Sequence, residues 1–338
     1  MINNPTIALA VFFGLVGLII LVWYLVKMTT LLRNRTTTDK VLTEDVLKQL
    51  YHVENSGRKA SITELAGALK IKEGRLIGLV EEMRIKDLII SEGHLLQLTP
   101  AGRDYALQMV RVHRLYEKYL SEKTGVDKLE WHDRAEIMEH KLSPQDIELL
   151  DKSLGSPRFD PHGDPIPTAS GELESDNWKP LSIIKANSLA RIVHIEDEPE
   201  TIYKQIIAQR LHIGSQIKVI EANDHRVKFF CEGETFSLSP IVATNINVVL
   251  LSPEEHFEEN AVRLSALDTG EQGTILGIST ECRGAARRRL LDLGFIPGTA
   301  IETELSSPME EPRAYLIRNT LIALRQEQSD LILIEKTS

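Results

Sequence analysis

Apolar residues follow three different patterns along this chain of 338 residues. Residues 6–26 form one apolar run without a charged side chain. Between residues 43 and 154, apolar positions recur every three or four residues, as in amphipathic helices. Beyond residue 180, short runs rich in β-branched residues alternate with turn residues. The pattern therefore predicts a hydrophobic N-terminal helix, a helical middle and a β-rich C-terminal half.

The N-terminal run, TIALAVFFGLVGLIILVWYLV, is long enough to cross a bilayer as a helix. No Lys or Arg precedes it, and Lys27, Arg33, Arg35 and Lys40 follow it, which places the bulk of the chain in the cytoplasm. A cleaved signal peptide is disfavoured, because the run is too long and lacks a basic leader and a small-residue cleavage site. Residues 1–35 are thus expected to form a single-pass transmembrane anchor and linker in the inner membrane.

Residues 36–105 have the order of a winged helix-turn-helix domain. A helical pattern begins near Thr43, Ser61 is placed to cap a short second helix, and a tight turn leads into a third helix over residues 73–86. Two β-rich runs then flank a turn at Gly93, which predicts a hairpin. This succession of helix, helix–turn–helix and hairpin is typical of winged helix domains.

The remainder divides into a helical domain, a linker and a repeat. Further helices are expected over residues 106–154, and residues 155–180, rich in Pro, Gly, Ser and Asp, are expected to form a linker. Beyond it, IGSQIKVI and ETFSL correspond to PGTAIETEL and NTLIAL later in the chain. This internal repeat predicts two small β-barrels, over residues 181–252 and 261–338.

The helix expected over residues 129–142 carries four potential metal ligands on one face: His132, Glu136, Glu139 and His140. The preceding helix adds His113 and Glu117 at the same helical spacing. Imidazole and carboxylate ligands without thiolate suit Mn²⁺ or Fe²⁺, and Zn²⁺, Co²⁺ and Ni²⁺ also bind such sets. A solvated helix face with His/Glu pairs is the alternative. A metallopeptidase is excluded, because Glu136 occupies the position at which the H-x-x-E-H motif needs its first histidine.

Several segments of this region resemble the diphtheria-toxin repressor and manganese-repressor family of metal-dependent transcriptional regulators: TEDVLKQLYHVE, LQLTPAGRDYA, VHRLYEKYL, WHDRAEIMEH and PHGDPIP. The resemblance runs from about residue 43 to 167, and more weakly to 251. It implies a homodimer with a winged helix, a helical metal-binding and dimerisation domain and an SH3-like barrel. By position it implies a primary metal site of Asp45, Glu136, Glu139 and His140, and an ancillary site of His113, Glu117 and His132. Glu198 and Glu200 fall near positions where some members add ligands, and the choice between Fe²⁺ and Mn²⁺ stays open.

The resemblance also implies operator DNA as a partner, contacted by the third helix of the winged domain. The residues at the matching positions are Lys72, Arg75, Ile77 and Gly78. Family members usually present Ser, Thr, Pro and Gln there, and residues 36–105 contain 10 Lys and Arg against 11 Asp and Glu. A winged helix that serves protein contacts is therefore the alternative.

Residues 264–336 resemble FeoA, the small protein that accompanies the bacterial ferrous-iron transporter, in the segments LSALDTGEQGTILGI and RRRLLDLGFIPGT. The resemblance implies a second SH3-like barrel that acts through protein contacts, which makes a ferrous-iron transporter a candidate partner. The basic run from Arg287 to Arg289 is either a solvated helix face or part of a docking surface. No nucleophile paired with a base and no phosphate-binding loop occurs in the sequence, so an enzyme is not expected.

Together these features predict an α+β multidomain protein with a transmembrane helix, a winged helix-turn-helix, a helical metal-binding dimerisation domain and two SH3-like β-barrels. The net charge of −10 excludes a general attraction to nucleic acid, so DNA contacts require a local patch. The lone cysteines Cys231 and Cys282 lack the spacing of a zinc site and fit a reducing compartment. The expected function is metal-dependent, membrane-anchored transcriptional regulation. The alternative is a metal sensor that regulates a transporter without binding DNA.

Overall fold

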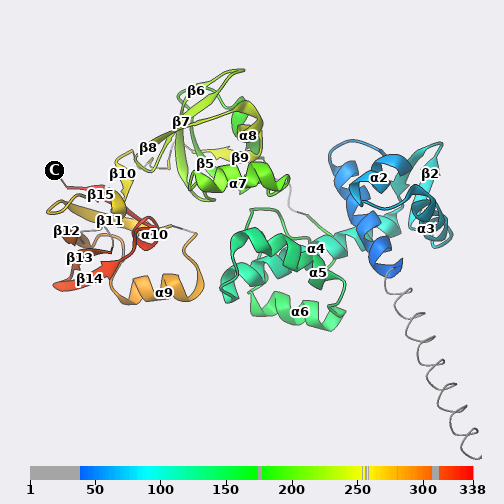
Figure 1. The fold of residues 1–338 in the computed structure, drawn as a ribbon, viewed down its shortest axis with the longest axis horizontal. Helices are drawn as coiled ribbons and strands as arrows, with labels where there is room; N and C mark the ends of the chain where they lie inside the picture. The colour runs from blue at the N-terminus through cyan, green and yellow to red at the C-terminus, as the bar shows by residue number, and fades with distance from the viewer. Residues whose placement is uncertain are drawn as a thin grey trace, which may run out of the picture. The chain divides into compact units, whose positions relative to one another are not determined.

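A computed structural model describes residues 39–173, 177–252, 254, 255, 257, 259–279, 281–306 and 312–337 (Figure 1). The chain divides into two compact units. The first contains the described residues up to 112, together with residues 139–141 and 169–171. The second contains residues 113–138 and 142–168 and the described residues from 172 onward.

The first unit is a small α/β domain with a three-stranded antiparallel sheet in the order β1-β3-β2. The Ser61 hydroxyl accepts a hydrogen bond from the Glu64 backbone N–H and so caps α2, as expected from the sequence. Its elements are a helix over residues 39–55, β1 (Ala60–Ser61), α2 (Ile62–Ala68), α3 (Glu73–Ile85), β2 (Ile89–Glu92), β3 (Leu95–Leu98) and the first half of α4 (Pro100–Lys123). The predicted order of helix, helix–turn–helix and hairpin is therefore present.

The start of α4 packs tightly against the segment that leads into the hairpin. The Thr99 hydroxyl donates a hydrogen bond to Asp87 O and accepts one from Gly102 N, at 2.6 and 3.0 Å. The Thr99 N–H donates to Leu88 O. A Cβ atom on Gly102 would lie 1.9 Å from Leu88 O, so this position accommodates glycine alone.

The Gly102→Ala substitution is expected to destabilise the first unit by about 3 kcal/mol, because the backbone of Leu88 must move. Gly67→Ala in α2 is the matched control. A Cβ at Gly67 meets no atom within 4 Å, so this change is expected to be neutral or to stabilise the helix by up to about 1 kcal/mol. Urea denaturation of both variants measures the difference. Equal midpoints for Gly102→Ala and the unsubstituted protein would contradict the packing described.

The second unit begins with helices that carry the histidines of the predicted ancillary metal site. They are the second half of α4, the 3₁₀ turn η1 (Lys128–Glu130), α5 (Trp131–Glu139), whose last residue belongs to the first unit, and α6 (Pro144–Ser153). Ser143 and Asp146 form a reciprocal capping box at the start of α6, and Pro144 occupies its first turn. These residues define the start of the helix, which lies within the range of residues 106–154 expected to be helical.

Two six-stranded antiparallel sheets follow, in the orders β4-β9-β5-β6-β7-β8 and β10-β15-β11-β12-β13-β14. The strands of the first sheet are β4 (Lys179–Pro180), β5 (Leu189–Ile195), β6 (Gln216–Ala222), β7 (Val227–Cys231), β8 (Glu234–Leu238) and β9 (Ile246–Leu250), and its helices are η2 (Leu181–Ile183), α7 (Glu200–Ala208) and α8 (Pro240–Thr244). The second sheet consists of β10 (Ala261–Arg263), β11 (Gln272–Ile278), β12 (Ala300–Ser306), β13 (Arg313–Ile317), β14 (Thr320–Leu324) and β15 (Ile332–Lys336), with η3 (Leu264–Ala266), α9 (Gly284–Asp292) and α10 (Gln326–Ser329).

The equivalent strand orders of the two sheets agree with the internal repeat, but neither of the predicted SH3-like barrels is closed within the described residues. Within the described residues, β4 and β8 remain the edges of one sheet, and β10 and β14 the edges of the other. β4 and β10 are only two and three residues long, which is too short to close a sheet. Irregular registers between β5 and β9 and between β11 and β15 bend the sheets without closing them.

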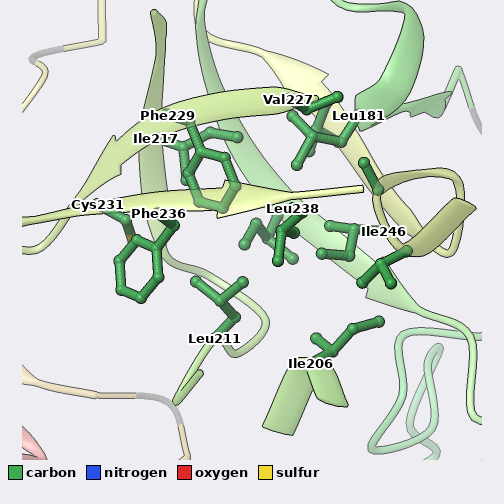
Figure 2. Close-up of a cluster of buried hydrophobic side chains, with 14 of the residues drawn as sticks. Leu181, Ile206, Leu211, Ile217, Val227, Phe229, Cys231, Phe236, Leu238 and Ile246 are labelled. Atoms are coloured by element: carbon green, nitrogen blue, oxygen red, sulfur yellow. The ribbon is translucent and has the colours of Figure 1, made fainter. Parts of the chain in front are cut away.

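Each sheet has its own apolar core. In the first, Phe229 of β7 and Phe236 of β8 are cross-strand partners whose rings stack with centroids 5.5 Å apart. Figure 2 shows these rings in the same buried cluster as Ile206 of α7 and Leu211. The loop between β5 and α7, which contains two residues of the site described below, is therefore held between two elements of this core.

The structure contradicts the expected inner-membrane localisation: among the helices it describes, none is long and apolar enough to cross a bilayer. The longest of them, α4, has 24 residues but carries charged side chains such as Arg103, Asp104, Arg111 and Arg114, because it packs as an amphipathic helix. The run at residues 6–26, from which the anchor was predicted, lies outside the described residues.

Candidate metal centre

The first cluster of potential metal ligands joins two segments that are distant in sequence. Asp45 lies on the helix over residues 39–55, whereas Glu139 and His140 lie at the end of α5. One ligand atom from each of the three lies within 4.8 Å of the others. The structure thus brings together three of the four residues expected in the primary site.

His140 is held between carboxylates on both ring nitrogens. Its Nε2 lies 3.2 Å from Asp45 Oδ1, and its Nδ1 lies 2.8 Å from Glu44 Oε2. Glu44 is buried and also accepts a hydrogen bond from the Tyr105 hydroxyl at 2.6 Å. A carboxylate on one ring nitrogen orients a histidine for metal binding through the other. Glu44, which the sequence analysis did not single out, is therefore the orienting partner of His140.

Lys48, one turn beyond Asp45, also enters this cluster. Its Nζ lies 2.7 Å from Glu139 Oε1, and the Glu139 side chain is only 1% exposed. An ammonium group so close to a buried carboxylate neutralises it and competes with any cation for the same oxygen. The sequence analysis missed this residue as well.

The second cluster lies in the second unit and contains all three residues expected in the ancillary site. His113 Nε2 and His132 Nδ1 lie 3.1 and 3.6 Å from Glu117 Oε1. The two imidazole rings meet edge to face with centroids 4.9 Å apart. His113 and Glu117 are buried on α4, so the carboxylate is available only to groups inside this cluster.

Acidic residues from α5 and from the loop after β5 surround His132. Its Nδ1 lies 3.2 Å from Asp197 Oδ2, and its Nε2 lies 3.5 and 3.7 Å from Glu198 and Glu136 carboxylate oxygens. Burial lowers the pKa of His132, but hydrogen bonds with Asp197, Glu117 and Glu136 outweigh it and raise the pKa to about 12. The imidazole is thus protonated in the absence of a metal.

Two of the residues considered from the sequence have contacts other than those expected. Glu136, expected with Asp45, belongs to the second unit, where it approaches His132. Its place in the primary site stays a prediction. Glu200 is exposed at the start of α7 and pairs with Lys204 at 2.6 Å. Asp197, three residues earlier, approaches the histidines instead.

The candidate DNA contacts lie on and just before α3. Leu76 and Leu79 are buried, so this helix presents Arg75, Ile77 and Gly78 on its exposed face, and the exposed Lys72 precedes its first turn. Arg75 pairs with Asp39. A Cβ on Gly78 would meet no atom within 4 Å, so packing inside the unit does not require glycine at this position.

Metal binding at the first cluster is expected to depend steeply on pH. Burial lowers the pKa of His140, but hydrogen bonds with Asp45 and Glu44 and the charge of Glu139 raise it to about 9. The raised pKa favours the metal-free form at low pH, and a metal must displace the proton. Mn²⁺ affinity should therefore rise by about tenfold per pH unit between pH 6 and 8 and level off near pH 9. Calorimetry in buffers of different ionisation enthalpy measures the released proton, and a pH-independent affinity would contradict this expectation.

Comparisons with known proteins identify two domains of the chain, one of which contains most of the cluster residues. Residues 99–168 match the family described as "Iron dependent repressor, metal binding and dimerisation domain", and residues 262–336 match the FeoA domain. The chain is 28% identical over 194 residues to the diphtheria toxin repressor of Corynebacterium diphtheriae, covering 54% of this chain and 86% of that protein. A manganese-dependent transcriptional repressor in complex with manganese has a similar structure, with a TM-score of 0.58 at 28% identity, covering 62% of this chain and 100% of that one.

The chain resembles the iron-dependent repressors. Its metal-binding and dimerisation domain supplies ligands to both clusters, Glu139 and His140 to the first and His113, Glu117 and His132 to the second. Its FeoA domain is 36% identical over 77 residues to an Fe(2+) transport protein A/Fe(2+) transporter FeoB fusion protein of Porphyromonas gingivalis, covering 23% of this chain and 9% of that protein. The repressor relatives are regulators and not enzymes, in agreement with the expectation from the sequence.

Proposed function

We propose that this iron-dependent repressor relative is a homodimeric, metal-dependent transcriptional repressor that binds operator DNA. In this proposal residues 36–105 bind DNA and residues 106–154 bind metal and form the dimer. The observation that carries the proposal is the cluster of Asp45, Glu139 and His140, because it joins the first helix of the winged domain to the end of α5.

The residues of this cluster have separate tasks. Glu44 fixes the His140 ring through Nδ1 and leaves Nε2 directed at Asp45. Asp45 and Glu139 supply anionic oxygens from two different helices, and without a metal the Lys48 ammonium offsets the charge of Glu139. A divalent cation, when bound, supplies positive charge to both carboxylates and so favours the arrangement of helices seen here.

Fe²⁺ and Mn²⁺ are the ions that the donors suit best. Both clusters offer imidazole nitrogen and carboxylate oxygen, and no cysteine belongs to either one. Cys231 and Cys282 are buried elsewhere in the described part of the second unit. Zn²⁺, Co²⁺ and Ni²⁺ are expected to bind the same residues in vitro.

A selection experiment tests the proposal. Fragments of the source genome are mixed with the protein at fixed moderate salt, with Mn²⁺ or with a chelator, and the retained DNA is sequenced. Defined fragments should be retained only with Mn²⁺. Arg75→Ala should weaken binding to them by about tenfold, because one phosphate or base contact is lost, and the exposed Arg58→Ala serves as control. Retention of the same fragments without metal would contradict metal dependence.

A second candidate function follows from the FeoA domain. Because this domain also occurs fused to a ferrous-iron transporter, residues 262–336 are candidates for a contact with such a transporter. In that case metal binding at the clusters would control the contact with the transporter, and the winged helix would not bind DNA. Metal binding without retention of any genomic fragment would favour this function.

A further inference from the structure

His162 has a buried nitrogen atom that no hydrogen bond satisfies. The residue is only 3% exposed, and its Nε2 makes no hydrogen bond with any residue that the structure describes. A buried, unsatisfied imidazole nitrogen costs free energy unless a bound water or ion occupies its lone pair. The neighbourhood of this atom therefore indicates what it binds.

The backbone around His162 is fixed in place. Its N–H donates a hydrogen bond to Asp160 Oδ1 at 2.8 Å, and its carbonyl accepts one from the Ile195 N–H at 3.0 Å. The next residue, Gly163, has φ +95° and packs so closely that a Cβ would lie 2.1 Å from Val193 O. The ring contacts Trp131 and Tyr203 edge to face. The orientation of Nε2 is thus determined by the fold before any ligand binds.

The His162 ring lies beside two carboxylates of the second metal cluster. Its Nε2 lies 3.9 Å from Asp197 Oδ2, and ligand atoms of Glu117, His162 and Asp197 all lie within 4.8 Å of one another. His113, Glu117 and His132 form a separate triad by the same measure. Glu117 belongs to both triads, so its carboxylate lies between two possible cation positions.

The surroundings suit a second cation. Two carboxylates shared among three imidazoles form a donor set typical of paired divalent ions. A cavity of about 330 Å³ borders His162 and leaves room for water to complete a coordination shell and for an ion to enter.

We propose that Glu117, His162 and Asp197 bind a second divalent transition-metal ion, next to the ion bound by His113, Glu117 and His132, with the Glu117 carboxylate bridging the two. His162, which lies in the segment expected to be a linker, thereby becomes a metal ligand. The second ion would connect this segment to Glu117 of α4. The inference rests on the proposed metal dependence and adds a two-metal centre to it. Carboxylate-bridged ions of this kind lie about 4 Å apart.

Manganese stoichiometry and electron paramagnetic resonance of the full chain test the proposal. The protein is freed of metal with a chelator, loaded with Mn²⁺ alone, desalted, and assayed for manganese by mass spectrometry. The unsubstituted protein should show a spin-coupled Mn²⁺ pair. His162→Phe preserves an aromatic ring against Trp131 and Tyr203 but removes the ligand. It should lose one ion per chain together with the coupled signal.

His212→Gln is the matched control, because His212 is also largely buried but hydrogen bonds to Ser279 outside the cluster. It should keep both the stoichiometry and the coupled signal. An unchanged manganese content in a folded His162→Phe protein would overturn the two-metal centre. If that variant does not fold, the spectrum of the unsubstituted protein decides, because isolated Mn²⁺ signals alone would also overturn it. Metal-dependent DNA binding retained in such a protein would leave the proposed function intact.

Discussion

Replacing His140 by alanine is expected to lower Mn²⁺ affinity at the first cluster by on the order of 100-fold and to abolish metal-dependent DNA binding at micromolar metal. His140 contributes the imidazole of the cluster, and both of its nitrogens are used, one by Glu44 and one directed at Asp45. Its loss removes a ligand and leaves Glu44 with its contacts to Tyr105 and Lys40. Metal titrations followed by calorimetry and by DNA binding measure both effects.

The control for this substitution is His225→Ala, because His225 is exposed between β6 and β7, outside the domain proposed to bind DNA. It should leave metal affinity and DNA binding unchanged. A His140→Ala protein that still responds to metal at the concentration needed by the unsubstituted protein would exclude the first cluster as the regulatory site. The second cluster would then have to carry the response.

Replacing Lys48 by methionine is expected to have the opposite effect and to raise Mn²⁺ affinity about tenfold. The ammonium lies 2.7 Å from Glu139 Oε1 and must be displaced or repelled when a cation binds there. Two like charges about 4 Å apart at a partly buried site repel by up to about 4 kcal/mol. Relaxation of the flexible lysine side chain reduces this repulsion. The expected tenfold rise in affinity corresponds to about 1.4 kcal/mol. Methionine preserves the length and the apolar stem of lysine.

Lys40→Met on the same helix is the matched control, because Lys40 is 59% exposed and lies 3.5 Å from Glu44. Its effect on metal affinity should be within about twofold. The Lys48→Met protein should also gain more thermal stability from Mn²⁺ than the unsubstituted protein, since metal-free Glu139 then lacks the Lys48 ammonium. Weaker metal binding by Lys48→Met would show that Lys48 supports the site and does not compete with the ion.

The elements of the fold could be predicted because their signals are local. Ser61 and Ser143 cap helices with their own side chains, and the apolar spacing of residues 43–53 defines a helix without reference to the rest of the chain. Closure of the two sheets could not be predicted, because it depends on the lengths of the edge strands β4 and β10. The apolar pattern of the strands in the repeat is the same in an open and in a closed sheet.

Helical spacing and the family resemblance predicted the ligands that lie on helices, and Asp45 came from the resemblance alone. His113 and Glu117, or Glu139 and His140, are visible as spacings within one helix, whereas Asp197 and His162 lie in irregular segments and meet them only through tertiary contacts. The proximity of Lys48 to the site could have been predicted from the sequence. Lys48 is one helical turn from Asp45 and is therefore near any ion bound there. Glu44 is adjacent to Asp45 and reaches His140 only through the packing of the two helices.

Fluorescence anisotropy of a selected genomic fragment tests metal-dependent DNA binding most directly. The full chain is titrated onto the labelled fragment at one fixed salt concentration, once with Mn²⁺ or anaerobic Fe²⁺ and once with a chelator. Tight binding with metal, and binding at least 100-fold weaker with the chelator, is the expected result. Equal affinity under both conditions would contradict the proposed function, as would the absence of binding in a protein shown to hold metal.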